Sequence, residues 1–283
     1  MKRATLSIGL IQLKPTEDPR KNLAHTLRLA SAAADRGAKI ICLPELYRLR
    51  YFPQKDKARA RHLAETIPGE STRAFSRLAA ERDVAVIVPL FERAGERFFN
   101  SAAVIDAGGK LLGTYRKVHI PHDPLFYEKS YFAPGDLGFK VFRTRYARVS
   151  ALICYDQWFP ETARASVLAG AEILFYPTAI GAIRGTRPPE GDWREAWVTI
   201  QRGHAIANGV HVAAVNRTGV EGKLRFFGTS FVADAFGNVV KRASRGREEV
   251  LVVPVDLSMN REIRDGWGFL RNRRPRCYRP LVA

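Results

Sequence analysis

Hydrophobic and polar positions follow two periods in the first third of the chain. Residues 4–11 alternate weakly, and 39–43 and 84–88 are short apolar runs, so all three segments are predicted strands. Between them, apolar residues recur at helical spacing over 18–35 and over 70–82. The order strand, helix, strand, helix, strand predicts a layered α/β fold.

Glycine-rich turns separate further strands in the middle of the chain. Residues 101–105 and 110–115 flank the turn Asp106-Ala107-Gly108-Gly109, which predicts a β-hairpin. A similar unit recurs over 229–241. The recurrence is either a weak internal echo, as when two sheets face each other, or ordinary hairpin chemistry, since Asp and Gly favour such turns.

The second half continues the mixture of strands and helices. A helix is predicted directly after residue 160, because proline suits the first helical turn. A second helix, over 192–208, follows a loop with Gly181 and carries Trp193 and Trp197 one turn apart, which indicates a packing face rather than a binding stripe. Three further apolar runs are predicted strands: 172–176, 210–215 and 250–255.

The C-terminal tail, residues 258–283, is rich in arginine and proline. It contains Trp267, Phe269 and Tyr278, and aromatic residues in a tail indicate that it packs on its own body or on a neighbouring subunit. No linker divides the chain, so residues 1–283 are predicted to form one domain that includes the tail.

Composition narrows the class of protein. A length of 283 residues suits a single α/β sandwich or barrel, and 46% hydrophobic residues supply a large core. No run reaches the ~18 apolar residues that a membrane helix needs. The N-terminal apolar run lacks a small-residue cleavage site and is therefore interpreted as a strand rather than a signal peptide. Three widely spaced cysteines argue against a disulfide framework, so a reducing, cytoplasmic location is expected.

The net charge of +18 raises the question of nucleic-acid binding, a role that strongly basic chains often have. The basic residues are spread over the whole chain, without RNP, helix-turn-helix or zinc-finger spacing, which favours a solvated arginine-rich surface. Neither a nucleic-acid nor a membrane partner is expected. His119, His122 and His204 lack paired metal-ligand spacing, so no metal or other cofactor is expected.

Three apolar segments lead to reactive side chains. I-I-C-L-P-E-L ends on Glu45, L-L-G-T-Y-R-K-V-H-I-P holds Lys117, and A-L-I-C ends on Cys154. Open α/β sheets build their sites at such strand ends. A thiol, with an unperturbed pKa of about 8.5, needs a base to become a nucleophile, and a lysine can stabilise an oxyanion. Together the three residues predict a Cys–Glu–Lys site for attack on an amide carbon.

Each of these residues also has a structural alternative. Glu45 could cap the following segment, Lys117 could pair with a surface acid, and Cys154 could be a small core residue, as most free cysteines are. The other two cysteines, Cys42 in a strand and Cys277 in the tail, are interpreted as inert.

The sequence resembles the nitrilase superfamily of carbon–nitrogen hydrolases through L-P-E-L, Y-R-K-V-H-I-P and I-C-Y-D-Q-W-F-P-E, over essentially the whole chain. The resemblance implies a four-layer α-β-β-α sandwich that pairs through its sheets into a homodimer or larger homo-oligomer. It implies Glu45 as general base, Lys117 as oxyanion stabiliser and Cys154 as nucleophile. Glu128, in F-Y-E-K-S-Y-F-A-P-G, matches a second glutamate of the family that positions the lysine and the attacking water.

A finer resemblance is to the branch of N-carbamoylputrescine amidohydrolases, through Y-D-Q-W-F-P-E-T-A-R-A, L-F-Y-P-T-A-I-G, W-G-F-L-R-N-R-R-P and H-I-P-H-D-P. It implies cleavage of the ureido C–N bond of a small carbamoyl amine through a cysteine thioester. Tyr155 and Trp158 are candidate substrate-binding residues, and Asp123 is the candidate ammonium contact, unless it only fixes its own loop. Tyr155 stands where this branch is expected to have tryptophan, and the loop 183–191 also departs from the branch.

Two other functions remain open from the sequence. Another amidase of the superfamily would act on N-carbamoyl-β-alanine or on an ω-amide of a dicarboxylic acid, and such a carboxylate substrate favours an arginine in the pocket. More remotely, the chain would be a basic nucleic-acid-binding protein with a vestigial site, and salt-sensitive binding would then be expected.

Overall fold

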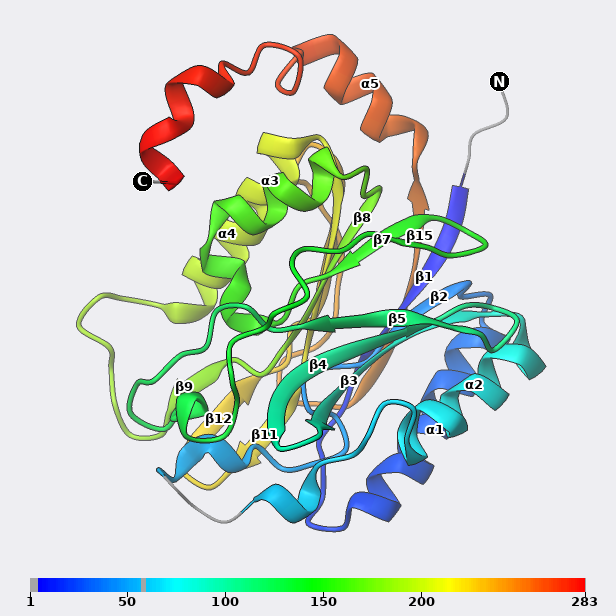
Figure 1. Ribbon diagram of the computed structural model, residues 1–283, viewed down its shortest axis with the longest axis vertical. Helices are drawn as coiled ribbons and strands as arrows, with labels where there is room; N and C mark the ends of the chain where they lie inside the picture. The colour runs from blue at the N-terminus through cyan, green and yellow to red at the C-terminus, as the bar shows by residue number, and fades with distance from the viewer. Residues whose placement is uncertain (1–4, 57–59, 283) are drawn as a thin grey trace.

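The computed structural model describes residues 5–56 and 60–282, and in this part of the chain two six-stranded sheets pack face to face between helices (Figure 1). Ala4, where the first predicted strand begins, lies outside the described residues. The layers are helices, sheet, sheet and helices, and the expected α-β-β-α sandwich is confirmed.

The first sheet has the strand order β15-β1-β2-β3-β4-β5, with β1, β2 and β3 parallel and the other pairs antiparallel. Its strands are β1 (Thr5–Gln12), β2 (Ile40–Cys42), β3 (Ala85–Ala94), β4 (Arg97–Ile105), β5 (Leu111–Arg116) and β15 (Glu249–Asp256).

The second sheet has the order β14-β13-β10-β8-β7-β6, with β7, β8 and β10 parallel. Its strands are β6 (Phe142–Arg143), β7 (Arg148–Ala151), β8 (Ile173–Thr178), β10 (His211–Asn216), β13 (Phe231–Ala233) and β14 (Val239–Arg242). The two predicted glycine-turn hairpins are thus confirmed as β4–β5 and β13–β14, one in each sheet.

Helices cover the outer faces of both sheets. α1 (Pro19–Asp35) and α2 (Glu70–Arg82) cover the first sheet, and α3 (Pro160–Leu168) and α4 (Trp193–Asn208) cover the second (Figure 1). Two of these helices begin after the aspartates at which the sequence predicts their start. Asp18 accepts from two backbone N–H groups of α1, and Asp192 accepts from one of α4.

Alternation along the strands explains why both faces of the first sheet are buried. In β2, Ile40 and Cys42 belong to the core between the sheets, whereas Ile41 belongs to the core under α1 and α2. Successive side chains of a strand point to opposite faces, so a continuous apolar run is what a doubly covered strand requires. These short central strands therefore separate the core between the sheets from the core under the helices. They end at the same edge of the molecule.

The structure corrects several predicted boundaries. The strand predicted over 84–88 runs from Ala85 to Ala94 and pairs with a β4 that begins at Arg97, so a hairpin around Gly95 was missed. Charged residues hid it from the apolar pattern. The sequence predicted that Cys154 ends a strand. In the structure, β7 ends at Ala151, and Cys154 instead opens a short 3₁₀ turn.

A small third sheet was also not predicted. It has the order β11-β12-β9 and consists of β9 (Gly181–Ile183), β11 (Thr218–Glu221) and β12 (Leu224–Phe227). Gly181 had been interpreted as part of a loop. Five short 3₁₀ turns complete the described structure: η1 (Phe52–Gln54), η2 (Arg61–Leu63), η3 (Glu128–Ser130), η4 (Cys154–Trp158) and η5 (Pro275–Val282).

The C-terminal tail begins with α5 (Ser258–Trp267), which contacts the second sheet. Asn260 Oδ1 accepts from Nδ1 of His211 at 2.8 Å, and Asn260 Nδ2 donates to the carbonyl of Glu172 at 2.8 Å. Beyond α5 the tail runs outward over the top of the molecule (Figure 1), where the side chain of Leu281 is 69% exposed. In the described part of the chain, every helix is too short or too polar to span a lipid bilayer.

Candidate active site

Four of the predicted site residues follow strands or open short turns on neighbouring loops. Glu45 lies three residues after β2, Lys117 directly after β5, Glu128 at the start of η3 and Cys154 at the start of η4. The Lys117 ammonium donates to Glu45 Oε1 at 2.8 Å and to Glu128 Oε2 at 2.6 Å. The structure therefore brings one amine and two carboxylates, distant in sequence, into direct contact.

This charged trio is removed from solvent. Glu45 and Lys117 are 0% exposed and Glu128 is 1% exposed. Burial opposes the charge of Lys117, but the two carboxylates outweigh burial and raise the pKa of its ammonium above the usual range. Burial also raises the pKa of Glu128 to about 7, although Lys117 favours its ionised form. Lys117 is thus a fixed cation, and Glu128 is poised to titrate near neutral pH.

Neutral donors orient the two carboxylates. Asn100 Nδ2 donates to Glu45 Oε1 at 2.7 Å, and the Tyr51 hydroxyl donates to Glu128 Oε1 at 2.7 Å. Glu45 Oε2 is buried and has no hydrogen-bond partner among the described residues. A buried acceptor without a partner is costly, and here it is free to accept a proton from a reacting group.

A tight glycine contact fixes the backbone at Lys117. The Gly135 N–H donates to the Lys117 carbonyl at 2.8 Å. A Cβ on residue 135 would lie 2.1 Å from the Arg116 carbonyl oxygen, so only glycine allows this approach.

Cys154 is held in an uncommon backbone conformation. Its φ is +44°, in the left-handed region that non-glycine residues rarely adopt. The buried Asp156 carboxylate secures this turn by accepting from the Ile153 N–H at 2.9 Å, from the Tyr115 hydroxyl at 2.7 Å and from His119. The turn is therefore over-determined by its surroundings, as a strained functional residue requires.

The Cys154 thiol is neutral at rest. Burial, followed by the charge of Glu45, raises its pKa well above the usual value, while Lys117 and a backbone hydrogen bond from Ala179 act in the opposite direction. A nucleophilic thiolate therefore needs transfer of the thiol proton to a base during the reaction. Of the two carboxylates that contact Lys117, Glu45 is the one with an oxygen that has no hydrogen-bond partner in the described structure.

Cys154 faces a cavity of about 490 Å³, whose wall includes Tyr155 and Trp158. Glu128 lies at the inner part of the wall, and Asp123 lies on an exposed loop at the rim. Burial, followed by the negative charge of Asp123, raises the pKa of the Tyr155 hydroxyl, and both residues line the cavity. All seven predicted site residues thus surround one site.

Some cavity residues were missed by the sequence interpretation. Glu190 lies on the cavity wall and accepts from Trp193 Nε1 at 2.6 Å, so Trp193 is not purely a packing residue. Trp197 does pack, because it is fully buried and contacts the Phe231 ring edge-on. Nothing in the local pattern marked Asn100 or Tyr51, because their roles arise only from tertiary contacts.

The described residues hold no group of three or more His, Cys, Asp or Glu side chains arranged to bind a metal ion.

Comparisons with known proteins agree on one family. Residues 7–265 match the family model described as carbon-nitrogen hydrolase. The chain is 43% identical to the N-carbamoylputrescine amidase of Solanum lycopersicum, over 100% of this chain and 96% of that protein. It is 39% identical to the citrullinase of Francisella tularensis, over 99% of both chains. A crystal structure of a carbon-nitrogen hydrolase from Helicobacter pylori matches with a TM-score of 0.93 and 41% identity, over 99% of both chains.

Proposed function

The chain belongs to the carbon–nitrogen hydrolase family, and we propose that it hydrolyses N-carbamoylputrescine to putrescine, ammonia and carbon dioxide. One observation carries the choice of substrate: among the described residues, every charged side chain on the cavity wall is acidic. Asp123 and Glu190 suit a cationic amine and repel a carboxylate, whereas Glu128 is paired with Lys117. The full-length similarity to amidases of this specificity supports the same choice.

In the first chemical step, the Cys154 sulfur attacks the ureido carbon and its proton passes to Glu45. Lys117, which contacts Glu45 and Glu128, and the Tyr155 N–H stabilise the negative charge that develops on the ureido oxygen. Glu45 then gives the proton to the terminal nitrogen, the C–N bond breaks, and ammonia leaves. The product is a thioester between the sulfur and the alkylcarbamoyl group.

In the second step, Glu45 takes a proton from water, and the resulting hydroxide attacks the thioester carbon. The C–S bond breaks and the thiolate recovers its proton from Glu45. The released alkylcarbamic acid decays to carbon dioxide and putrescine. Glu128 stays bonded to Lys117 through its Oε2 atom and keeps the ammonium directed at the site.

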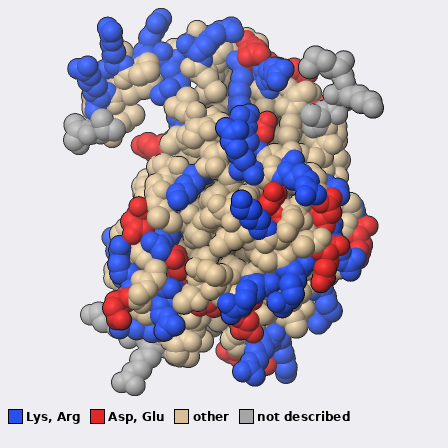
Figure 2. All heavy atoms as spheres, turned by 45° about the vertical axis from the view of Figure 1, so that its right-hand side comes forward, with Lys and Arg blue, Asp and Glu red and all other residues tan. Residues whose placement is uncertain are grey.

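The positive surface charge is proposed to be a solvated exterior rather than a nucleic-acid interface. Figure 2 shows Lys and Arg side chains spread over one face of the molecule with Asp and Glu side chains between them. Several exposed arginines are paired with acids, as Arg82 is with Asp35 and Arg97 is with Asp136. Over the body of the described structure on this face, charges that are paired and dispersed in this way do not form the continuous basic groove that a phosphate backbone favours.

The protein is also proposed to act as a homodimer or larger homo-oligomer. Trp267 is 57% exposed and Leu281 is 69% exposed on a tail that leaves the body of the molecule. Large exposed apolar side chains on such a segment are typical of surfaces that a second subunit covers.

Ammonia release from a substrate panel tests the proposed specificity. N-carbamoylputrescine, citrulline, N-carbamoyl-β-alanine and an ω-amide of a dicarboxylic acid would be compared by kcat/KM. We expect the carbamoyl amine to exceed each acid by at least ~10²-fold, because a carboxylate placed against like charges costs several kcal/mol. Citrulline is the sharpest comparison, since it differs from N-carbamoylputrescine only by a carboxylate. Equal or greater kcat/KM for any acid would overturn the proposed substrate.

The acidic rim predicts a separate effect on substrate binding. Asp123→Asn and Glu190→Gln should each raise KM for N-carbamoylputrescine by roughly tenfold with a smaller change in kcat, because each removes about 1–2 kcal/mol of attraction for the distal ammonium. Glu195→Gln is the matched control, since Glu195 is an exposed acid on α4 that is paired with Arg194. If Asp123→Asn has the kinetics of this control, Asp123 has no role in binding the amine.

A further inference from the structure

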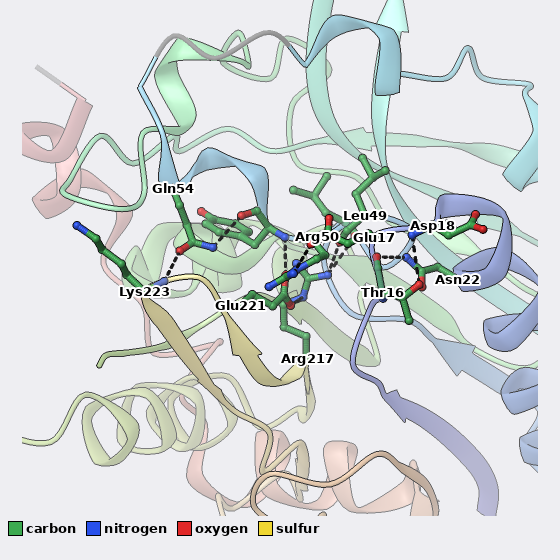
Figure 3. A network of polar contacts seen from close by, with 12 residues as sticks. Thr16, Glu17, Asp18, Asn22, Leu49, Arg50, Gln54, Arg217, Glu221 and Lys223 are labelled. Carbon is green, nitrogen blue, oxygen red and sulfur yellow. Dashed lines mark hydrogen bonds and ion pairs between the residues drawn. The ribbon is translucent and has the colours of Figure 1, made fainter. Parts of the chain in front are cut away.

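A buried ion pair lies behind the active site, between the end of β10 and the small third sheet. Arg217 is 0% exposed and Glu221 is 1% exposed, and Arg217 Nε lies 3.3 Å from Glu221 Oε1. Figure 3 shows this pair at the centre of a polar network that includes Leu49 and Arg50. The proposed reaction uses neither Arg217 nor Glu221.

Both members of the pair bind the chain segment that follows Glu45. Arg217 Nη2 donates to the carbonyl of Leu49 at 2.6 Å and to the carbonyl of Leu46 at 3.3 Å. Glu221 Oε2 accepts from the backbone N–H of Tyr51 at 2.7 Å. The pair therefore holds three backbone groups of residues 46–51, and we refer to Arg217 and Glu221 together as the clamp.

The clamped segment touches both carboxylates of the active site. At its start, Glu45 accepts from Lys117, and at its end, the Tyr51 hydroxyl donates to Glu128. Leu46, between them, has a φ of +50°, so the segment turns in a conformation that a β-carbon disfavours. An unsupported segment of this kind would relax, and both carboxylates would shift relative to Lys117.

Side-chain packing connects the clamp to the same place. The Arg217 guanidinium lies over the Phe226 ring at 5.3 Å, and Phe226 meets the Tyr51 ring edge-on at 5.7 Å. Tyr51 in turn contacts Phe126 of the cavity wall at 5.8 Å. The clamp thus holds the backbone of Tyr51 directly and the ring of Tyr51 through one aromatic neighbour.

Stability alone does not account for this pair. A buried ion pair often contributes no more than two well-packed apolar residues, because both ions lose their hydration. Arg217 Nη1 also has no hydrogen-bond partner among the described residues, which adds to the cost. What the pair supplies, and what an apolar pair cannot, is three directed hydrogen bonds to one backbone segment.

We propose that Arg217 and Glu221 are positioning residues for the hydrolysis, which act by fixing residues 46–51 so that Glu45 and Glu128 keep their places on Lys117. The proposal rests on the catalytic roles proposed above for Glu45 and Glu128. It does not depend on the identity of the substrate, so it is tested with whichever panel compound is turned over fastest.

The first experiment compares Arg217→Lys, Glu221→Gln and Tyr51→Phe with Glu17→Gln. Glu17 is 81% exposed and pairs with Arg50 at the outer end of the same network, so its substitution is a matched control for loss of one ion pair. We expect the first three variants to lower kcat by about 10-fold or more with KM changed by less than about 3-fold, whereas Glu17→Gln retains wild-type kinetics.

The pH dependence of kcat/KM separates positioning from a general loss of packing. Glu128 faces Lys117, Glu45, Tyr51 and Cys154, and the Tyr51 hydrogen bond favours its ionised form. Loss of that bond raises the pKa of Glu128, so Lys117 loses its ionised partner at a higher pH. The acid limb of the profile, expected near pH 7, should therefore move to higher pH in Tyr51→Phe.

The clamp variants should move the acid limb in the same direction, and Tyr51→Phe combined with Glu221→Gln should move it no further than Tyr51→Phe alone. Such non-additivity is expected when two substitutions act through one contact. An additive shift, or unchanged kcat and an unchanged profile in folded Tyr51→Phe, would overturn the proposal.

A double variant, Arg217→Met with Glu221→Leu, separates position from stability. Removing both charges should restore the thermal midpoint toward that of the wild type, relative to either single substitution. We expect kcat to remain low, because the hydrogen bonds to Leu49 and Tyr51 are still absent. Recovery of kcat together with the midpoint would show that the pair is structural only and would overturn the proposal. If the wild-type protein turns over none of the panel compounds, the proposed function has failed, and this result is distinct from failure of the positioning role.

Discussion

Replacing Cys154 with alanine is expected to reduce ammonia release by at least ~10⁴-fold, because in the proposed mechanism the sulfur forms the covalent bond on which both chemical steps depend. The substitution removes one buried atom beside a cavity that already exists, so the fold should persist. KM, or the Kd of an unreacted substrate, should change little, since Asp123 and Glu190 remain on the cavity wall. The measurements are ammonia release and thermal unfolding of the purified variant.

Cys42→Ala is the matched control for this experiment. Cys42 is also fully buried, and burial likewise raises the pKa of its thiol, but it lies within β2 and faces the core between the sheets. It should retain wild-type kcat within about twofold. Mass spectrometry after mixing with substrate should find a covalent adduct, equal to the substrate less ammonia, on the wild type and on Cys42→Ala only. A Cys154→Ala protein that keeps near-wild-type turnover would remove the basis of the mechanism.

The layers of the fold could be predicted from sequence because they depend on local periodicity. Short apolar runs alternating with helical patterns specify strands covered on both faces, and β2 with its Ile40 and Ile41 is such a case. The pattern failed where strands carry charge. Glu92 and Arg93 continue β3, and Glu92 is buried only because Arg116 from β5 neutralises it. A partner that lies outside the local window leaves no periodic signal.

The reactive atoms of the site could be predicted, but the groups that orient them could not. Lys117 directly follows β5 and Cys154 opens the turn η4 that follows β7, and both stand in sequence motifs beyond the carboxyl ends of strands, where α/β sheets place functional groups. Tyr51, Arg217 and Glu221 are ordinary residues in the sequence, and the hydrogen bonds that connect them to the site cross 77 to 170 positions along the chain. Glu190 was missed for a related reason, because its loop departs from the expected branch and only the folded chain places it on the cavity wall.

Replacing Glu45 with glutamine is expected to lower kcat by ~10³-fold with little change in KM, because general acid–base catalysis contributes factors of about 10²–10⁴. Glutamine retains the size of the side chain and an oxygen that can accept from Lys117 and Asn100. It places an NH₂ group, however, where Glu45 Oε2 is a buried acceptor without a partner in the described structure. The variant can therefore bind substrate but can neither take the thiol proton nor activate water.

Glu92→Gln distinguishes this effect from the loss of any buried carboxylate. Glu92 is 5% exposed and pairs with Arg116, yet it lies outside the cavity wall. Glu92→Gln should lower the thermal midpoint and leave kcat nearly unchanged. Glu45→Gln should instead lower kcat and leave the thermal midpoint nearly unchanged. Rapid-mixing experiments should also find slow formation of the thioester in Glu45→Gln, because proton transfer from the thiol, whose pKa burial raises, precedes attack. Fast thioester formation in this variant would assign the thiol proton to another base and restrict Glu45 to the hydrolytic step.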